Sequence, residues 1–355
     1  MIDESVDIVA CSNCFEDHGL KIDAQKIGIV DDITCPVCKA VDGYKLKMVH
    51  LETLAYGYFV WGSLVRCDYG AAPCVQFNNH QKNSIGVPEW CKNDVNLISQ
   101  ILGVGFFHYG PRMWMVGEVE PLKDLQKDAT RPQIVKRIVS EYPQRILDQN
   151  TLFYRIRKEP KKPTNPEEYD SPPSNLSGSG RFESNKIPVL YASPDLEVCV
   201  HESRFTAEDE LYVATLSASS ELNLLDMSVL LNEGNGVTEF ESLDMAVHML
   251  FLASSHSYHI TKSIAISAHD AGYDGIIYPS YFSLLRTGAT PFETVYGISH
   301  RMIPQYRDYE EAKSIPNLAI FGRPVAEGKV SIKCINKLIM RKVSYDFHFG
   351  IAEVL

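Results

Sequence analysis

Residues 189–204 read VLYASPDLEVCVHESR, and the pattern of apolar residues changes at Pro194. Val189–Ser193 is an apolar run with Val and Tyr, which is typical of a buried strand. Proline suits the first position of a helix, and Ser193 is a suitable N-cap before it. We therefore expect a strand followed by a helix that runs to about Phe205 and carries Glu202.

The same alternation continues along the second half of the chain. The apolar patterns predict further strands at Leu152–Arg157, Leu211–Leu216, Gly275–Pro279 and Leu318–Phe321. They predict helices at about Ser242–Ser255 and Thr261–Ala271, the second of which is stopped by Gly272. Strands mixed with helices in this way indicate an α+β fold.

The part of the chain before this region has a different pattern. Residues 1–48 contain paired cysteines, and residues 49–150 show helical periodicity, at Leu51–Val65, Val95–Phe107 and Pro132–Leu147. We expect three domains: 1–48 as a four-cysteine zinc module, 49–150 as a helical domain and 151–345 as a mixed-sheet domain.

Composition limits the classes of partner. The 355 residues carry a formal net charge of −11. An acidic surface repels the phosphates of nucleic acid, so nucleic-acid binding is disfavoured. The longest apolar stretch, residues 53–65, is about 13 residues long, whereas a membrane-spanning helix needs about 20. Because the N-terminus is acidic and lacks a basic region, we expect no signal peptide and a cytoplasmic protein without a membrane contact.

Four of the nine cysteines form two close pairs, Cys11-x2-Cys14 and Cys35-x2-Cys38. Each pair can present two thiolates from one tight turn, and two such turns make the tetrahedral four-sulfur site that zinc prefers. Four protein ligands leave no position for water, so the sequence predicts a structural zinc. The alternative is four buried or redox-active thiols.

Several polar residues that can take part in binding or catalysis lie on or beside the predicted elements of the second half. They are Arg155 on a strand, Arg181 after the glycines of Gly178-Ser-Gly180, Tyr191 and Glu202 in the opening stretch, and Ser280 after the Gly275–Pro279 strand. Guanidinium groups can fork onto phosphates, and a carboxylate can stabilise positive charge. Each residue alone is more often an ordinary surface residue.

Taken together, these segments resemble the RES family, named for its Arg, Glu and Ser. The matching stretches are Tyr154-Arg155, Gly180-Arg181-Phe182, Tyr191-Ala-Ser193 with Glu202 eleven residues on, Asp274-Gly-Ile-Ile-Tyr-Pro-Ser280 and Asn317-Leu-Ala-Ile-Phe321. The resemblance covers roughly residues 150–325. The four-cysteine segment with the helices that follow is also similar to the N-terminal extension of some RES proteins.

The resemblance implies an ADP-ribosyltransferase-like fold and a toxin that consumes NAD by phosphorolysis, by hydrolysis or by transfer of ADP-ribose to a protein. It implies that Glu202, Arg155 and Ser280 are catalytic. It also implies that Arg155, Arg181, Tyr191 and Ser280 bind NAD, and that a neutralising antitoxin is a possible partner.

Two features depart from the family pattern. Glu183 stands where the family usually has Asn, and a long insertion separates Ser280 from Asn317. These departures keep open a different class of function, a catalytically inactive protein in which the zinc module and helices bind a partner.

Overall fold

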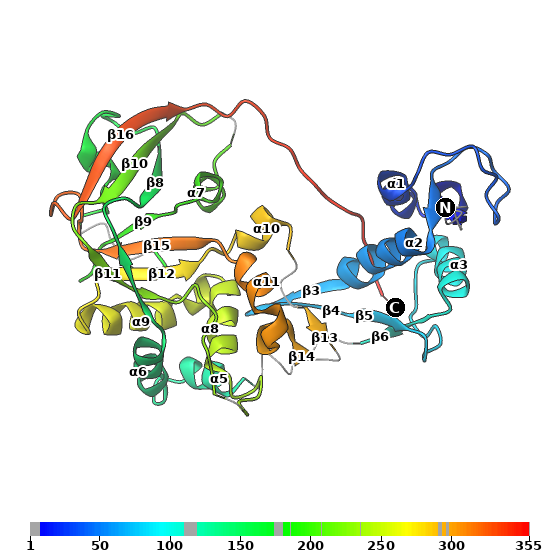
Figure 1. Ribbon diagram of the computed structural model, residues 1–355, viewed down its shortest axis with the longest axis horizontal. Coiled ribbons are helices and arrows are strands. Elements are labelled where there is room, and N and C mark those ends of the chain that lie inside the picture. Colours follow the sequence, from blue (N-terminus) through cyan, green and yellow to red (C-terminus); the bar gives the residue numbers. More distant parts are fainter. Residues whose placement is uncertain are drawn as a thin grey trace, which may run out of the picture. The chain divides into compact units, whose positions relative to one another are not determined.

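The computed structural model describes residues 8–109, 119–173, 180–184, 186–206, 208–234, 236–289, 293–295 and 298–354 (Figure 1). The chain divides into two compact units. The first comprises residues 1–67, 71–113 and 344–355, and the second comprises residues 68–70 and 114–343. The three predicted domain ranges concern independent folding and stay a prediction.

The described part of the first unit combines short strands with three α-helices. Strands β1 (Ile8–Cys11) and β2 (Lys45–Lys47) pair antiparallel, as do β5 (Val75–Asn78) and β6 (Gly105–His108), while β3 (Leu64–Cys67) pairs with β4 (Gly70–Pro73). Helices α1 (His18–Ile27), α2 (Met48–Ala55) and α3 (Lys92–Leu102) pack around a core that includes Phe59 and Phe106. The ring centroids of these two residues lie 4.6 Å apart.

Two helices predicted in residues 49–150 are shorter than expected, and strands replace their ends. Helix α3 ends at Leu102 because Gly103 adopts a left-handed conformation, with φ of 67°. Gly105–Phe107, expected to be helical, belongs to β6. Helix α6 (Arg131–Glu141) ends before Pro143, and the remainder of the expected helix forms β7 (Gln144–Leu147). Four-residue strands have too few alternations to show a clear period of two.

The third predicted helix of this range, Leu51–Val65, is α2 extended by turns of other geometry. A π-helical segment (Tyr56–Val60) and a 3₁₀ segment (Trp61–Ser63) follow α2, and β3 then begins at Leu64.

The second unit contains a five-stranded and a three-stranded sheet. The larger has the order β7, β11 (Leu222–Asp226), β12 (Gly275–Pro279), β15 (Pro316–Phe321) and β9 (Val189–Ala192). Only the β11–β12 pairing is parallel, whereas the other pairings of this sheet are antiparallel. The smaller has the order β16 (Val330–Leu338), β10 (Leu211–Ala218) and β8 (Leu152–Lys158). The α+β class predicted from the sequence is confirmed.

The second unit has three layers, the two sheets and a group of helices, with buried apolar side chains between them. One core lies between the two sheets and includes Phe153, Leu216 and Ile320. A second core lies between the larger sheet and a group of helices, and includes Leu250 and Ile264. These helices are α5 (Glu120–Gln126), α6, α8 (Leu243–Leu252) and α9 (Tyr258–Asp270), on the side of the larger sheet opposite the smaller one (Figure 1). The unit therefore begins before residue 150.

Helix α7 (Leu196–Ser203) starts two residues later than expected. Its N-cap is Asp195, whose side chain accepts a hydrogen bond from the Val198 amide at 2.9 Å. The predicted cap, Ser193, instead donates its hydroxyl to the Pro316 carbonyl at 3.1 Å, which ties the start of this helix to β15. A single bridge between Tyr154 and Ser193 also joins β8 to the end of β9. This junction places α7 beside the edges of both sheets.

Within the described part of the chain, no helix combines the length and the apolar character that crossing a bilayer requires.

Candidate active site

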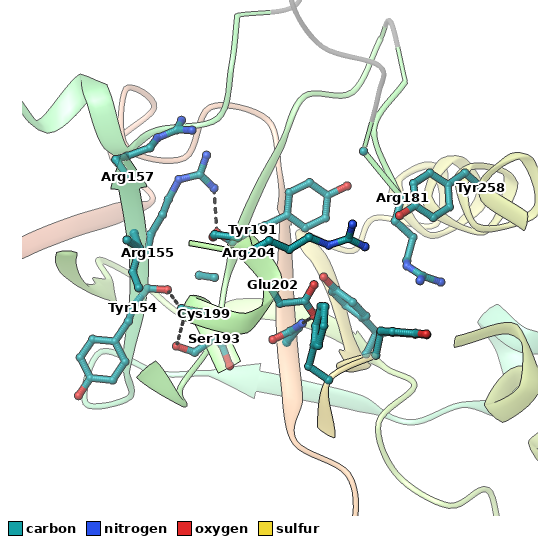
Figure 2. Close-up of a pocket in the computed structure, with 18 of the residues that line it drawn as sticks. Tyr154, Arg155, Arg157, Arg181, Tyr191, Ser193, Cys199, Glu202, Arg204 and Tyr258 are labelled. Carbon is teal, nitrogen blue, oxygen red and sulfur yellow. Dashed lines mark hydrogen bonds between the residues drawn. The ribbon is translucent and has the colours of Figure 1, made fainter. Parts of the chain in front are cut away.

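A cavity of about 530 Å³ lies in the second unit, where β8, the end of β9, α7 and the start of α9 meet (Figure 2). Four of the residues singled out in the sequence line it: Arg155, Arg181, Tyr191 and Glu202. Residues as far as 47 positions apart in the chain, Arg155 and Glu202, thus face one space, and its size is within the usual range for a ligand site. Ser280 does not line this cavity and contacts it through Glu202.

Arg155 and Arg157 come from one face of β8, as expected from the alternation of a strand. The Arg155 guanidinium donates to the Tyr191 carbonyl at 2.8 Å and to the Asp170 carbonyl at 3.1 Å. Arg157 donates to the carbonyls of Glu168, at 2.8 Å, and Asp170, at 2.8 Å. These acceptors are uncharged, so they orient the two guanidinium groups without neutralising them.

Burial is the main cause that lowers the pKa of Arg155, to about 9, and the neighbouring Arg157 charge adds to it. The guanidinium is therefore still protonated at neutral pH, in a place where positive charge is unfavourable. The Nε atom of Arg155 is buried and has no hydrogen-bond partner in the described residues. An anion in the cavity would stabilise both charges.

Gly180 and Arg181 form a tight turn against Tyr191. A Cβ atom on Gly180 would lie 2.7 Å from the Tyr191 hydroxyl, so a side chain does not fit at this position. The Tyr191 hydroxyl accepts a hydrogen bond from the Phe182 amide at 2.9 Å. Glu183, the departure from the family pattern, is buried and accepts from the Gly180 amide at 3.2 Å. Gly178 lies outside the described residues.

The Arg181 side chain is held between the C-terminal end of α8 and the start of α9. Its guanidinium donates to the carbonyls of Leu250, at 3.3 Å, and Ala253, at 3.0 Å. It also lies over the Tyr258 ring, 5.1 Å from the centroid, which is a cation–π geometry. As with Arg155, no carboxylate among the described residues forms an ion pair with it.

Glu202 is exposed on the last turn of α7, yet one of its oxygens is fixed by two buried donors. Its Oε1 accepts from the Ser280 hydroxyl at 2.6 Å and from the Asn317 side-chain amide at 2.7 Å. In the described residues no donor reaches its Oε2. One oxygen therefore sets the orientation of the carboxylate, and the other is available to a ligand.

The structure adds residues that the sequence analysis did not assign to the site. Arg157, Arg204 and Tyr258 line the same cavity. Asn317 was noted only as part of a matching stretch, and it binds Glu202. The alternation of β8 already placed Arg157 on the face of Arg155, and this signal was sufficient to find it. Nothing in the sequence pattern distinguishes Arg204.

The environment of Cys199, a cysteine that lines the cavity, disfavours its thiolate form. Its thiol donates to the Tyr154 carbonyl at 3.3 Å, and burial raises its pKa to about 12. A protonated thiol is a poor nucleophile. The reactive groups of the cavity are therefore guanidinium groups and one oriented carboxylate, a set that can bind an oxyanion and stabilise a cation beside it.

The four paired cysteines of the first unit come together. Their Sγ atoms are 3.8 Å apart for Cys11 and Cys14, 3.4 Å for Cys11 and Cys38 and 3.5 Å for Cys14 and Cys35. Tetrahedral zinc with bonds of about 2.3 Å requires sulfur atoms roughly 3.8 Å apart, and a disulfide requires about 2.05 Å. The cluster can hold a metal ion, and its donor set and spacing fit zinc.

Comparisons with known proteins identify one part of the chain. No curated protein matches it. A chain in the crystal structure of the M. tuberculosis MbcT–MbcA toxin–antitoxin complex resembles it with a TM-score of 0.31 and 12% identity, over 58% of this chain and 91% of that chain. The family model for the RES domain matches residues 152–288, which include Arg155, Arg181, Tyr191, Glu202 and Ser280. The chain therefore contains a RES domain.

Proposed function

We propose that this protein is an enzyme that degrades NAD by cleaving the bond between nicotinamide and ribose. The observation that carries the proposal is the orientation of Glu202. Two buried donors fix one of its oxygens, and the other is free in a cavity that also receives the guanidinium groups of Arg155 and Arg181. NAD combines the two features that these groups recognise, a diphosphate and a ribose that becomes cationic when nicotinamide leaves.

The proposed reaction needs little acid catalysis because nicotinamide leaves as a neutral molecule. The C1′–N bond breaks, its electron pair goes to the nicotinamide nitrogen, and the ribose becomes oxocarbenium-like. Glu202 would bind a ribose hydroxyl through Oε2 and stabilise the developing positive charge. Arg155 and Arg181 would hold the diphosphate, which fixes the ribose relative to the carboxylate.

Two of the proposed roles follow from contacts inside the protein. Tyr191 would form a wall of the nicotinamide site, since its hydroxyl is already engaged with the Phe182 amide. Ser280 was expected to bind the substrate, but its hydroxyl is donated to Glu202. We therefore assign Ser280 and Asn317 to the orientation of the carboxylate.

The acceptor of the ADP-ribose group decides which enzyme class applies. Water gives hydrolysis, phosphate gives phosphorolysis, and a protein side chain gives ADP-ribosylation. We favour a small acceptor, because the cavity of about 530 Å³ is suited to a ligand of small-molecule size.

The remaining proposals rest on the resemblance to RES toxins. An ADP-ribosyltransferase-like arrangement is consistent with a cavity beside the edges of two packed sheets. NAD loss would make the protein toxic, and a neutralising antitoxin that covers the cavity would suppress it. The four-cysteine cluster of the first unit would bind a structural zinc ion that takes no part in NAD cleavage.

Incubation of the purified protein with NAD, with and without phosphate, tests the function. Mass spectrometry of the products then separates the acceptors. Nicotinamide with free ADP-ribose indicates hydrolysis, nicotinamide with a phosphorylated ADP-ribose indicates phosphorolysis, and a mass gain on protein indicates transfer. Unchanged NAD under all conditions would contradict the proposal and favour the inactive partner-binding protein.

A further inference from the structure

Arg204 has an unusual backbone conformation directly after α7. Its φ of 52° and ψ of 41° place it in the left-handed region, which costs a residue with a side chain roughly 1 kcal/mol or more. In the described residues, only Lys39 and Glu159 share a positive φ without being glycine. Helices commonly end with glycine at this position. An arginine there is therefore a departure from the most stable choice.

The exposed side chain of Arg204 lines the cavity. Arg204 is among the residues that line it, and Figure 2 shows its side chain extended across the cavity toward the side of Arg181. Unlike Arg155 and Arg181, its guanidinium forms no hydrogen bond and no ion pair with the described part of the chain. Its donors thus face the cavity without a protein acceptor.

The charges around Arg204 favour an anionic ligand. Arg155, Arg157 and Arg181 line the same cavity and are bound to uncharged carbonyls. A fourth guanidinium group adds repulsion, and among the described residues Glu202 is the only carboxylate that lines the cavity. An oxyanion with several acceptor oxygens would reduce this repulsion and satisfy the forked donors.

We propose that Arg204 is a substrate-binding residue that contacts phosphoryl oxygens in the cavity. This inference rests on the proposed function, because phosphoryl groups are the anionic groups of NAD. Two sources share this chemistry: the diphosphate of NAD itself and a free phosphate that accepts the ADP-ribose group. The arginine would then be retained in its unfavourable backbone conformation for binding, at the expense of stability.

The test is Arg204→Gly, which removes the guanidinium group and suits the left-handed backbone. Glu159→Gly is the matched control, since it relaxes another left-handed residue that does not line the cavity. Arg137→Ala controls for the loss of one positive charge, because Arg137 is paired with Glu141 on the exposed side of α6. Steady-state NAD turnover is measured first without phosphate and then at increasing phosphate, together with the melting temperature.

We expect the melting temperature of Arg204→Gly to equal or exceed that of the wild type. We also expect the KM for NAD or for phosphate to rise by about tenfold or more, which corresponds to the loss of one charge-assisted hydrogen bond. A rise in the KM for NAD without phosphate assigns the contact to the diphosphate. A rise only in the KM for phosphate assigns it to the acceptor. Both controls should keep wild-type KM values. Unchanged KM values for both substrates in Arg204→Gly would overturn the inference.

The role of Arg204 can also be tested by a binding measurement that does not depend on NAD cleavage. If the wild type does not consume NAD, titration calorimetry with ADP-ribose compares the wild type with Arg204→Gly directly. Binding weakened by about tenfold in the variant supports a phosphoryl contact by Arg204. Equal affinity for both proteins, or binding by neither, overturns it.

Discussion

At the scale of single residues, the environment of Glu202 distinguishes it from the other exposed glutamates. Its Oε1 accepts from Ser280, 78 residues along the chain, and from Asn317, 115 residues along. Both donors are buried, with 5% and 3% of their surfaces exposed. Removing either donor leaves the Glu202 carboxylate with a single hydrogen bond, so its orientation is less well fixed.

Ser280→Ala should lower kcat for NAD cleavage by about ten- to a hundredfold while the KM for NAD changes little. The reason is the loss of one hydrogen bond to a charged group, which contributes about 1.5–3 kcal/mol. Steady-state kinetics gives the two parameters. Ser280→Thr, which keeps the hydroxyl, should restore part of the rate. An effect confined to KM would instead place Ser280 on the substrate.

The sequence located four of the cavity's polar residues but not their contacts. Arg155, Arg181, Tyr191 and Glu202 line one cavity, and their roles stay predictions. That Ser280 contacts Glu202 depends on how β12 and α7 pack, which local patterns do not specify. Arg204 was missed because its signal is a backbone conformation.

At the scale of elements, α7 sets the position of both Glu202 and Arg204. Its start is fixed by the Asp195 cap. In the first turn, Glu197 forms an ion pair with Arg286, with 2.8 Å between Oε2 and Nε. The helix has only eight residues, so its ends contribute much of its stability. The cap should therefore affect the site although it does not line the cavity.

Asp195→Ala should lower the free energy of unfolding by about 1 kcal/mol, the usual contribution of an N-cap, and should reduce NAD turnover. Urea unfolding followed by circular dichroism measures the first effect. Asp195→Asn retains a side-chain acceptor and should remain within a few tenths of a kcal/mol of the wild type. Equal destabilisation by both substitutions would show that the cap bond is not the cause.

The strength of the sequence signal explains which elements were predicted. Strands β8, β9, β10, β12 and β15 lie where the alternation or a buried apolar run indicated them. Strands β7, β11 and β16 of the second unit were not predicted. The cap of α7 was placed on Ser193 because both Ser193 and Asp195 are good caps, and only the contact of Ser193 with β15 separates them.

At the scale of the whole molecule, a segment near the C-terminus packs against the N-terminal part of the first unit, where the Phe349 amide donates to Asp23. The C-terminal residues 344–355 belong to this unit together with the four-cysteine segment. The Ile351 amide donates to the Tyr58 carbonyl at 3.2 Å, and Gly350 packs against Gly62 so closely that a Cβ on either would lie 2.3 Å from the other's Cα. No sequence pattern predicted this return of the chain, because it depends on contacts between residues about 290 positions apart.

The first unit should bind one zinc ion per chain, and Cys35→Ser should lose it and unfold at a lower temperature. A four-thiolate site contributes to folding directly, so loss of one ligand removes both metal and stability. Elemental analysis with a thermal melt measures the two effects. Cys334→Ser, an exposed cysteine on β16, is the control and should keep the metal. A metal-free wild type of unchanged stability under chelation would contradict a structural zinc.

Whether Glu202 acts on NAD within the cavity is decided by measuring nicotinamide release by the wild type and by Glu202→Gln. Glutamine keeps the size and the acceptor oxygen but removes the charge that stabilises the ribose cation. We expect nicotinamide release by the wild type and a rate at least about a hundredfold lower in the variant, with similar affinity for ADP-ribose. Release at the same rate by both proteins, or no release by the wild type, would contradict it.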